Sequence, residues 1–444
     1  MHIVQEIVEK NKAGYRAGIW SCCSGSPDVI RATLRRAQAT RTPALIESTS
    51  NQVNQEGGYT GMQPKDFAAL VYSLASEMGV RRDNIILAGD HLGPLPWTHL
   101  DAEEAMDKAE KLVVSCIMAG YSKIHLDTSM RVASDDPNAP FPVKVCAERG
   151  ARLCAACERA FDTYRIEHPD AVEPVYIIGS EVPVPGGECS GMIMGVTAPN
   201  DALKTIEIYR EEFERVGCGK AFERVVGLVV EMGVEFHEFS LDEYDRRRTV
   251  GVVQAMRNVP LCIEGHSSDY QTEENLTRMC EDGVAILKVG PALTFSQREA
   301  MFALEEIERI VYAETPEILS DYRATLEEVM LENPKHWQSY YKGSEHEQRI
   351  ARTYSFLDRC RYYLADKRVV AARAKLLENL SHNVIPLCIL SQFMPTQYFK
   401  VRSGELRNEP LDLLLDAIGT RIDCYLSATN YCGMGRPRRA GDIR

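Results

Sequence analysis

Histidines and carboxylates stand at the ends of several short apolar runs of the sequence. Asp90 and His91 end one run, His266 ends another, and Glu181 and His237 come with two more. Imidazole together with carboxylate suits a divalent transition metal, most simply zinc with one coordination position left open. The sequence therefore predicts a metal site whose ligands are His91, His266, Glu181 and His237.

Carboxylates and lysines in or just after the apolar runs predict acid–base or covalent chemistry. A metal of this kind acts as a Lewis acid on a carbonyl or developing enolate oxygen. Asp90, Glu181 or Asp127 is expected to move the proton. Lys288 or Lys123 supplies a second possible mechanism, because a lysine whose pKa is lowered by burial can form a Schiff base with a ketose carbonyl.

The apolar runs predict a scaffold that brings distant residues together. Eight runs read as strands, at residues 18–22, 44–48, 85–90, 123–127, 175–181, 225–231, 261–266 and 285–290. Amphipathic helical stretches such as PDVIRATLRRAQAT separate them. This alternation within residues 1–310 predicts an α/β fold, the (β/α)8 TIM barrel, with a doubly wound open sheet as the alternative. Active sites of such barrels lie at the carboxyl ends of the strands.

Alternation along the strands turns charged side chains toward the interior of the barrel. Lys123, His125 and Asp127 share one face of their strand. Charge inside a barrel is costly unless it is paired. Lys123 and the lysine of the last strand are therefore also expected to neutralise Glu47 or Glu264, which is a structural role.

Polar loops at the same rim predict where a substrate binds. The loops after the seventh and eighth strands are the usual phosphate site of this architecture, and the loop after the second strand is rich in amides and hydroxyls, which suits a polyol. An arginine of the C-terminal region is a further candidate. The predicted substrate- and phosphate-binding residues are Glu47, Asn51, Ser267, Ser268, Gly290, Thr294 and Arg359.

Beyond Val311 the apolar runs cease and helical patterns continue to the end of the chain. Residues 311–430 are expected to form a helical extension that packs on the barrel, and residues 431–444, rich in Gly and Arg, a disordered tail. The extension is rich in aromatic residues. Either Arg359 or Tyr363 reaches over the rim to a phosphate, or the aromatic residues form a subunit contact, as in a homo-oligomer.

The composition excludes several classes of protein. The formal net charge of −13 argues against non-specific binding of nucleic acid. The sequence has no apolar run long enough to cross a membrane and no signal-peptide pattern, so we expect a cytoplasmic protein. The 14 cysteines are too thinly spread for a disulfide framework, and Cys154 and Cys157 fall in a helical pattern as small apolar residues.

Six segments of the chain resemble the GatZ/KbaZ family, from about Gly18 to beyond Glu405. They are LIESTSNQVNQEGGYTGM, GDHLGP, SKIHLD, EVPVPGGE, HSSDYQT and ILKVGPALTF. The resemblance implies a barrel related to class II, metal-dependent ketose-bisphosphate aldolases. It also implies a D-tagatose-1,6-bisphosphate aldolase subunit that supports the activity and stability of a separate catalytic subunit. Older labels call such proteins tagatose 6-phosphate kinases, and some relatives are described as 4-epimerases of ketohexoses or their 6-phosphates.

The class II aldolase pattern carries over to few positions of this sequence. Asp90-His91 resembles the pair in which Asp is the acid and His binds zinc. Glu181 with the segment 186–188 resembles the acidic, double-glycine segment, and His266 with the serines after it resembles the loop that contacts metal and phosphate. Around His237 the sequence departs from the pattern of the remaining zinc ligand, and serines replace the glycines after His266.

Two functions follow from these observations. The first is an accessory subunit of a class II tagatose-1,6-bisphosphate aldolase. The second is an enzyme in its own right, a metal-dependent ketose or ketose-6-phosphate 4-epimerase or aldolase that acts by retro-aldol or enolate chemistry. The kinase label has no support, because the sequence contains no phosphate-binding Gly-x-x-x-x-Gly-Lys-Ser/Thr motif.

Overall fold

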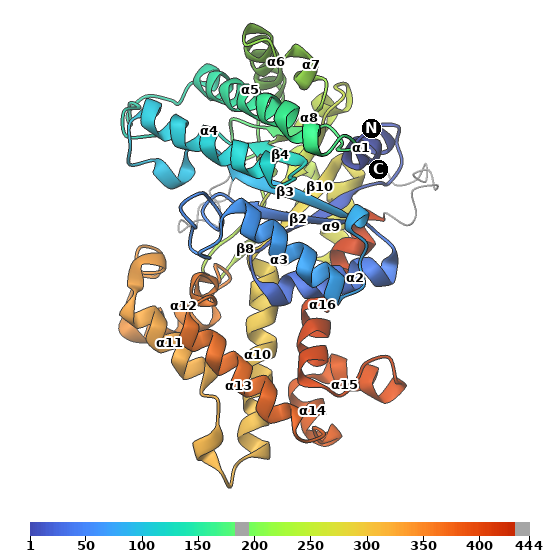
Figure 1. The fold of residues 1–444 in the computed structure, drawn as a ribbon, viewed down its shortest axis with the longest axis vertical. Helices are drawn as coiled ribbons and strands as arrows, with labels where there is room; N and C mark the ends of the chain where they lie inside the picture. Colours follow the sequence, from blue (N-terminus) through green and yellow to red (C-terminus); the bar gives the residue numbers. More distant parts are fainter. Residues whose placement is uncertain (183–194, 431–444) are drawn as a thin grey trace.

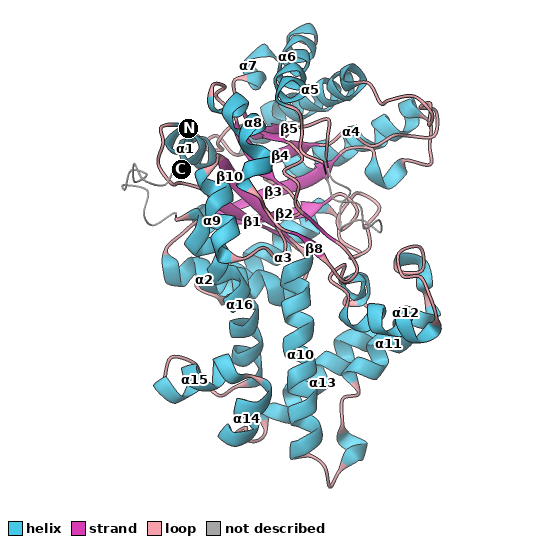
Figure 2. Cartoon of the chain, turned by 180° about the vertical axis from the view of Figure 1, so that it is seen from behind, coloured by secondary structure: helices cyan, strands magenta, loops and turns pink. Residues whose placement is uncertain are grey.

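Eight parallel strands close into a barrel in the computed structural model, which describes residues 1–182 and 195–430. The order around the barrel is β1-β10-β9-β6-β5-β4-β3-β2, so the first and last strands pair and no edge is left open (Figures 1 and 2). The strands are β1 Ile19–Cys23, β2 Ala44–Thr49, β3 Ile85–Leu92, β4 Lys123–Leu126, β5 Val175–Ile178, β6 Val225–Val229, β9 Cys262–Gly265 and β10 Val284–Val289. The predicted (β/α)8 barrel is confirmed.

Helices cover the outside of the barrel, and several match the helical patterns of the sequence. Gly79, Gly120 and Gly217 follow three of them with φ between 70° and 87°, where glycine ends a helix at little steric cost. The barrel helices are α2 Pro27–Thr40, α3 Pro64–Glu77, α4 Ala102–Met118, α5 Val143–Glu167, α6 Pro199–Arg215, α7 Gly219–Phe222, α8 Arg246–Arg257, α9 Glu273–Glu281 and α10 Pro291–Val311. Cys154 and Cys157 are buried in α5, as predicted.

Two strands end earlier than the sequence suggested. β5 ends at Ile178 rather than Glu181, and β6 ends at Val229 rather than Glu231. The next polar groups bond to other partners: the carbonyl of Gly179 accepts a hydrogen bond from the Tyr209 hydroxyl, and the N–H of Glu231 donates to Thr197. The backbone therefore leaves the ladder before these glutamates. A short antiparallel pair, β7 Glu235–Phe236 and β8 Leu241–Asp242, follows β6.

A helix at the amino terminus packs against the lower interior of the barrel. The apolar face of α1 (Ile3–Lys12) presents Val4, Ile7 and Val8 to buried residues of the strands, among them Leu45 and Ile286. The side chain of His2 caps this helix by accepting a hydrogen bond from the N–H of Val4. The barrel interior near the amino ends of the strands, here called the lower part, therefore contains this apolar cluster.

A helical region extends from one side of the barrel (Figures 1 and 2). Its helices are α11 Tyr322–Glu332, α12 Glu345–Tyr354, α13 Lys367–Ser381, α14 Leu387–Phe393, α15 Pro395–Ser403 and α16 Pro410–Thr429, with a 3₁₀ helix at Arg359–Tyr363. α10 runs from the barrel into this region across the boundary expected at residue 310, and α16 returns to pack against α2 and α9. The expected tail, residues 431–444, lies outside the described residues. Within the described ranges, no helix has the length and apolar character to cross a bilayer.

Candidate metal centre

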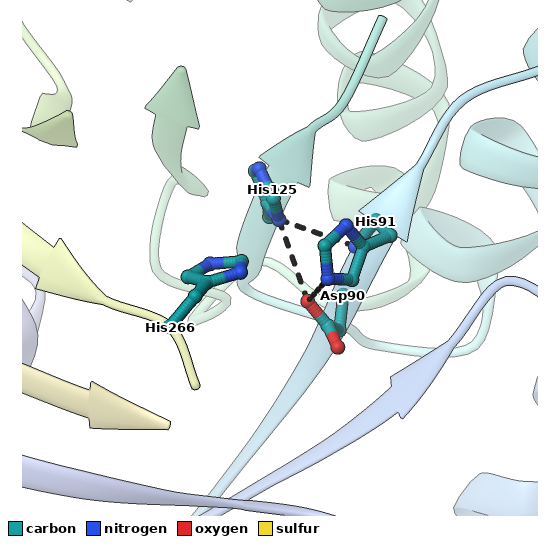
Figure 3. Close-up of side chains that lie close together, drawn as sticks. All are labelled: Asp90, His91, His125 and His266. Atoms are coloured by element: carbon teal, nitrogen blue, oxygen red, sulfur yellow. Dashed lines mark hydrogen bonds and ion pairs between the residues drawn. The ribbon is translucent and has the colours of Figure 1, made fainter. Parts of the chain in front are cut away.

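Three imidazole rings meet above the barrel interior. His91 comes from β3, His125 from β4 and His266 from the end of β9, and their ring centroids lie 4.9–5.0 Å apart. Asp90 completes the group, in which one ligand atom from each residue lies within 4.8 Å of the others (Figure 3). All four residues are buried. The sequence predicted His91 and His266 as ligands but not His125. The alternation of β4, which places His125 on the same face as Lys123 and Asp127, could have indicated it.

A local irregularity in β3 lets two consecutive residues join the cluster. Regular alternation would turn Asp90 and His91 to opposite faces. The register with β4 shifts between Gly89 and Leu92, and His91 has a φ of +46°, which is uncommon for a residue other than glycine. Such a bulge re-aims side chains. Gly93 then passes so close to β4 that a Cβ atom would lie 1.6 Å from the carbonyl oxygen of Asp127.

The chemistry of the cluster fits a divalent metal ion. Burial, together with the proximity of His91, lowers the pKa of His125 to about 4. Burial also lowers the pKa of His266 to about 4, against the hydrogen bond to Glu264. Both rings are therefore neutral near pH 7, which is the form that binds metal. Nε2 of His125 is buried without a hydrogen-bond partner among the described residues.

Asp127 orients one of the three rings. Nδ1 of His91 donates to the Asp127 carboxylate over 2.6 Å, which is the usual arrangement behind a metal-binding histidine. Burial alone would raise the pKa of Asp127, but the hydrogen bond from His91 and the electrostatic interaction with that ring hold it well below its usual range. The carboxylate also accepts hydrogen bonds from the N–H and hydroxyl of Ser129. Asp127 is thus a positioning residue behind the cluster.

A charged network lies beneath the metal cluster. Nζ of Lys123 is 2.6 Å from Glu47 and 2.7 Å from Glu264. Lys288 contacts Asp90 and lies 3.3 Å from Glu47 and 3.6 Å from Glu264. The predicted neutralisation of these glutamates by both lysines is confirmed.

The pairing of Lys123 bears on the Schiff-base mechanism. Despite burial, the charges of Glu264 and Glu47 raise its pKa above the ordinary value, so the amine is held as an ammonium ion. An ammonium ion has no lone pair with which to attack a carbonyl. Lys123 therefore serves as a counter-charge and not as a nucleophile.

A pocket opens above the cluster. Residues from the barrel rim and from the helical region line it. Those expected from the sequence are Asn51, Asp90, His91, His266, Ser267, Lys288 and Gly290; those missed include Thr49, Gln52, Tyr59, Asp269, Arg361 and Tyr362.

Arg361 is the arginine that reaches this pocket from the helical region, two positions from the expected Arg359. Its guanidinium donates to main-chain carbonyls and to the Tyr362 hydroxyl at 3.1 Å, and it lies 4.5 Å from that ring. Within the described part of the chain, no carboxylate lies within 4.0 Å of it. Its charge still interacts electrostatically with Asp358 and Asp269. A guanidinium that forms no ion pair at a pocket wall suits an anionic group of a ligand.

Comparison with known proteins identifies the family. A family model described as D-tagatose-1,6-bisphosphate aldolase subunit GatZ/KbaZ-like matches residues 4–430. The chain belongs to this GatZ/KbaZ-like family. The chain is also 41% identical to the crystal structure of a probable tagatose 6-phosphate kinase from Sinorhizobium meliloti 1021, with a TM-score of 0.83 over 93% of this chain and 100% of that chain. The resemblance seen in the sequence is confirmed.

More distant similarities connect the GatZ/KbaZ-like chain with aldolase structures. A fructose-bisphosphate aldolase from Campylobacter jejuni is 12% identical, with a TM-score of 0.45 over 96% of this chain and 94% of that chain. A putative fructose-1,6-bisphosphate aldolase from Coccidioides immitis is 14% identical, with a TM-score of 0.41 over 88% of this chain and 97% of that chain. Similarities at this level say nothing about function.

The remaining predicted residues of the GatZ/KbaZ-like chain lie away from the three-histidine cluster. His237 follows β7 and lies 3.1 Å from Asp242. Glu181 is exposed and accepts a hydrogen bond from the Thr197 hydroxyl, and the segment 186–188 lies outside the described residues. Arg359 stacks on Tyr340 at 3.4 Å and lines a neighbouring pocket. Among the described residues, the group of ligand atoms that could share a metal does not include His237 or Glu181. The substrate role expected for Arg359 stays a prediction.

Proposed function

We propose that the protein is a metal-dependent enzyme that cleaves or epimerises a phosphorylated ketose by retro-aldol or enolate chemistry. The observation that carries this proposal is the cluster of His91, His125 and His266 with Asp90 at a pocket floor. The three histidines would hold the metal, for which we propose zinc because of the nitrogen donors. When bound, the metal would polarise the substrate carbonyl and favour the developing enolate.

Asp90 is the residue we assign to proton transfer. Its carboxylate accepts a hydrogen bond from the Thr49 hydroxyl at 2.9 Å and contacts the ammonium of Lys288. A carboxylate at this position can take a proton from a substrate hydroxyl and return it later. Loss of that proton starts carbon–carbon cleavage of a hydroxyketone.

Arg361 is the residue we assign to a phosphate group of the substrate. The guanidinium lies at the wall of the pocket beside Tyr362 and forms no ion pair with a carboxylate of the described chain. A phosphate there would accept charge-assisted hydrogen bonds. Asn51 and Gln52 on the facing loop offer amides to sugar hydroxyls.

Metal analysis combined with turnover tests the proposal. Zinc-loaded protein is expected to convert D-tagatose 6-phosphate to an epimer or to triose products. His125→Ala is expected to lose both bound zinc and turnover. His237→Ala is the matched control, a buried histidine outside the cluster, and is expected to keep both. A zinc-loaded protein without turnover of any ketose or ketose phosphate would refute the proposal.

The family description supports a second candidate, the accessory subunit of an aldolase. In that role the protein would bind a class II catalytic subunit in the cytoplasm and raise its activity or solubility. Co-expression tests this directly: a catalytic subunit that gains neither activity nor solubility speaks against it. The His125→Ala variant separates the two candidates, because an accessory role does not require bound metal.

A further inference from the structure

The loops after β9 and β10 form one wall of the pocket, and their hydrogen-bond donors already have partners. One carboxylate oxygen of Asp269 accepts from the N–H groups of Gly290 at 3.0 Å and Ala292 at 2.8 Å, at the amino terminus of α10. The Ser268 hydroxyl donates to the carbonyl of Lys288 at 2.5 Å. The helix terminus that could bind an anion is therefore filled by a carboxylate of the protein itself.

A donor of α10 that lies outside the residues lining the pocket is also engaged. The hydroxyl of Thr294, in the first turn of α10, donates to Asp358 at 2.7 Å, and Asp358 is held in turn by Arg298 at 2.9 Å. A phosphate arriving here would meet no free hydroxyl at Ser268 or Thr294. It would meet a carboxylate instead.

Asp269 is held in place from the helical region. The Tyr425 hydroxyl of α16 donates to the carbonyl of Ser268 at 2.8 Å, and the Tyr270 hydroxyl donates to the carbonyl of Phe356 at 2.6 Å. The residues on both sides of Asp269 are thus tied to segments more than 80 positions away in the sequence. These bonds fix the backbone on both sides of Asp269, whose 4% exposed side chain is held by the N–H groups of Gly290 and Ala292.

We propose that Asp269 determines specificity by keeping phosphate away from the amino terminus of α10. The pocket then accepts a ketose monophosphate or a free ketose, with any phosphate at Arg361, and discriminates against a ketose bisphosphate. This inference rests on the proposed function, because it names the substrate class of the same pocket. Its physical basis is repulsion between a fixed carboxylate and a phosphate competing for the same N–H groups.

Calorimetric binding to the zinc-loaded full chain tests the inference. The probes are D-tagatose 6-phosphate, D-tagatose 1,6-bisphosphate and inorganic phosphate. The wild type is expected to bind the bisphosphate roughly tenfold or more weakly than the monophosphate, as repulsion between two close charges in partly screened surroundings requires. Asp269→Ser is expected to remove that difference and to gain binding of inorganic phosphate.

Two further variants keep the test decisive. Asp269→Asn removes the charge while keeping an oxygen acceptor for both N–H groups, so it serves if the serine variant does not fold, and it is expected to reduce the bisphosphate penalty. Glu56→Gln is the matched control, because it removes a carboxylate from the neighbouring pocket without touching α10. It is expected to leave the ratio of the two affinities unchanged.

The outcomes separate this inference from the proposed function. Equal affinity of the wild type for both sugar phosphates, or an unchanged ratio in the Ser and Asn variants, overturns the role of Asp269. If no ketose binds or reacts, the proposed function fails. Inorganic phosphate then decides the role of Asp269: phosphate binding by Asp269→Ser and not by the wild type supports it, and its absence from both overturns it.

Discussion

The lower and upper parts of the barrel interior are built from the same strands and have opposite characters. β2 contributes Leu45 to the apolar lower cluster and Glu47 to the charged network, and β10 contributes Ile286 and Lys288 in the same way. A step of two residues along a strand therefore changes the surroundings from hydrocarbon to ion pairs. The lower layer gains stability from each buried side chain separately, whereas each charge of the upper layer depends on its partner. The comparison teaches that the stability supplied by the apolar layer allows the same strands to carry buried charges near their carboxyl ends.

Removing the buried ammonium of Lys123 is expected to have the largest effect. Lys123→Met breaks the two shortest ion pairs of Glu47 and Glu264 and leaves them with Lys288 as their shared counter-charge, and breaking a buried pair costs about 3–5 kcal/mol. The free energy of unfolding, measured by urea denaturation, is expected to fall by this amount.

Two controls sharpen that measurement. Ile286→Val in the lower layer removes one methylene and is expected to cost about 0.5–1.5 kcal/mol. Adding Glu264→Gln to Lys123→Met is expected to recover part of the loss, because one of the two carboxylates that lost a partner disappears. Equal losses for Lys123→Met and Ile286→Val would show that the two layers do not differ as described.

Removing the charge behind His91 is expected to weaken metal binding rather than folding. Asp127→Asn replaces the acceptor of the 2.6 Å hydrogen bond, and changes of this kind reduce metal affinity by roughly 10–100-fold. Competition with a zinc chelator measures the affinity. Asp242→Asn, which disturbs the contact with His237 outside the cluster, is expected to leave zinc affinity unchanged; an equal loss there would contradict the assignment of the cluster.

The buried histidines are expected to make the metal-free protein less stable in acid. His125 and His266 have a pKa near 4 in the folded state and 6.5 in the unfolded chain, so between these values the unfolded chain binds more protons. Stability is therefore complete above pH 6.5 and is lost as the pH falls toward 4, at about 1.4 kcal/mol per pH unit for each histidine.

Urea denaturation across this pH range measures the effect. The slope of the free energy of unfolding against pH is expected to be smaller in His125→Gln, because one histidine fewer takes up a proton on unfolding. Ile286→Val carries no titratable group and is expected to lower stability without changing the slope. Identical slopes for the wild type and His125→Gln would contradict the neutral state of His125.

Sequence reasoning succeeded where the physical cause is local. The apolar runs around Leu45 and Ile286 predict buried parallel strands, because burial and the two-residue period act within one segment. The same period placed Lys123 and His125 in the interior, so the ion pair with Glu47 could be predicted. The position of His125 in the candidate metal cluster was missed, because the sequence of one strand does not show which residues of other strands lie beside it.

The sequence by itself determined the fold class, the family and the end of the barrel at which the candidate site lies. Only the tertiary structure decided which side chains meet. Closure of the barrel and the bulge in β3 bring His91, His125 and His266 together, while the early end of β5 leaves Glu181 in a loop. The placement of Asp269 and Arg361 likewise depends on how α10 and the helical region pack on the rim. Distances across a closed barrel follow from register and loop packing, which depend on contacts between segments far apart in the chain.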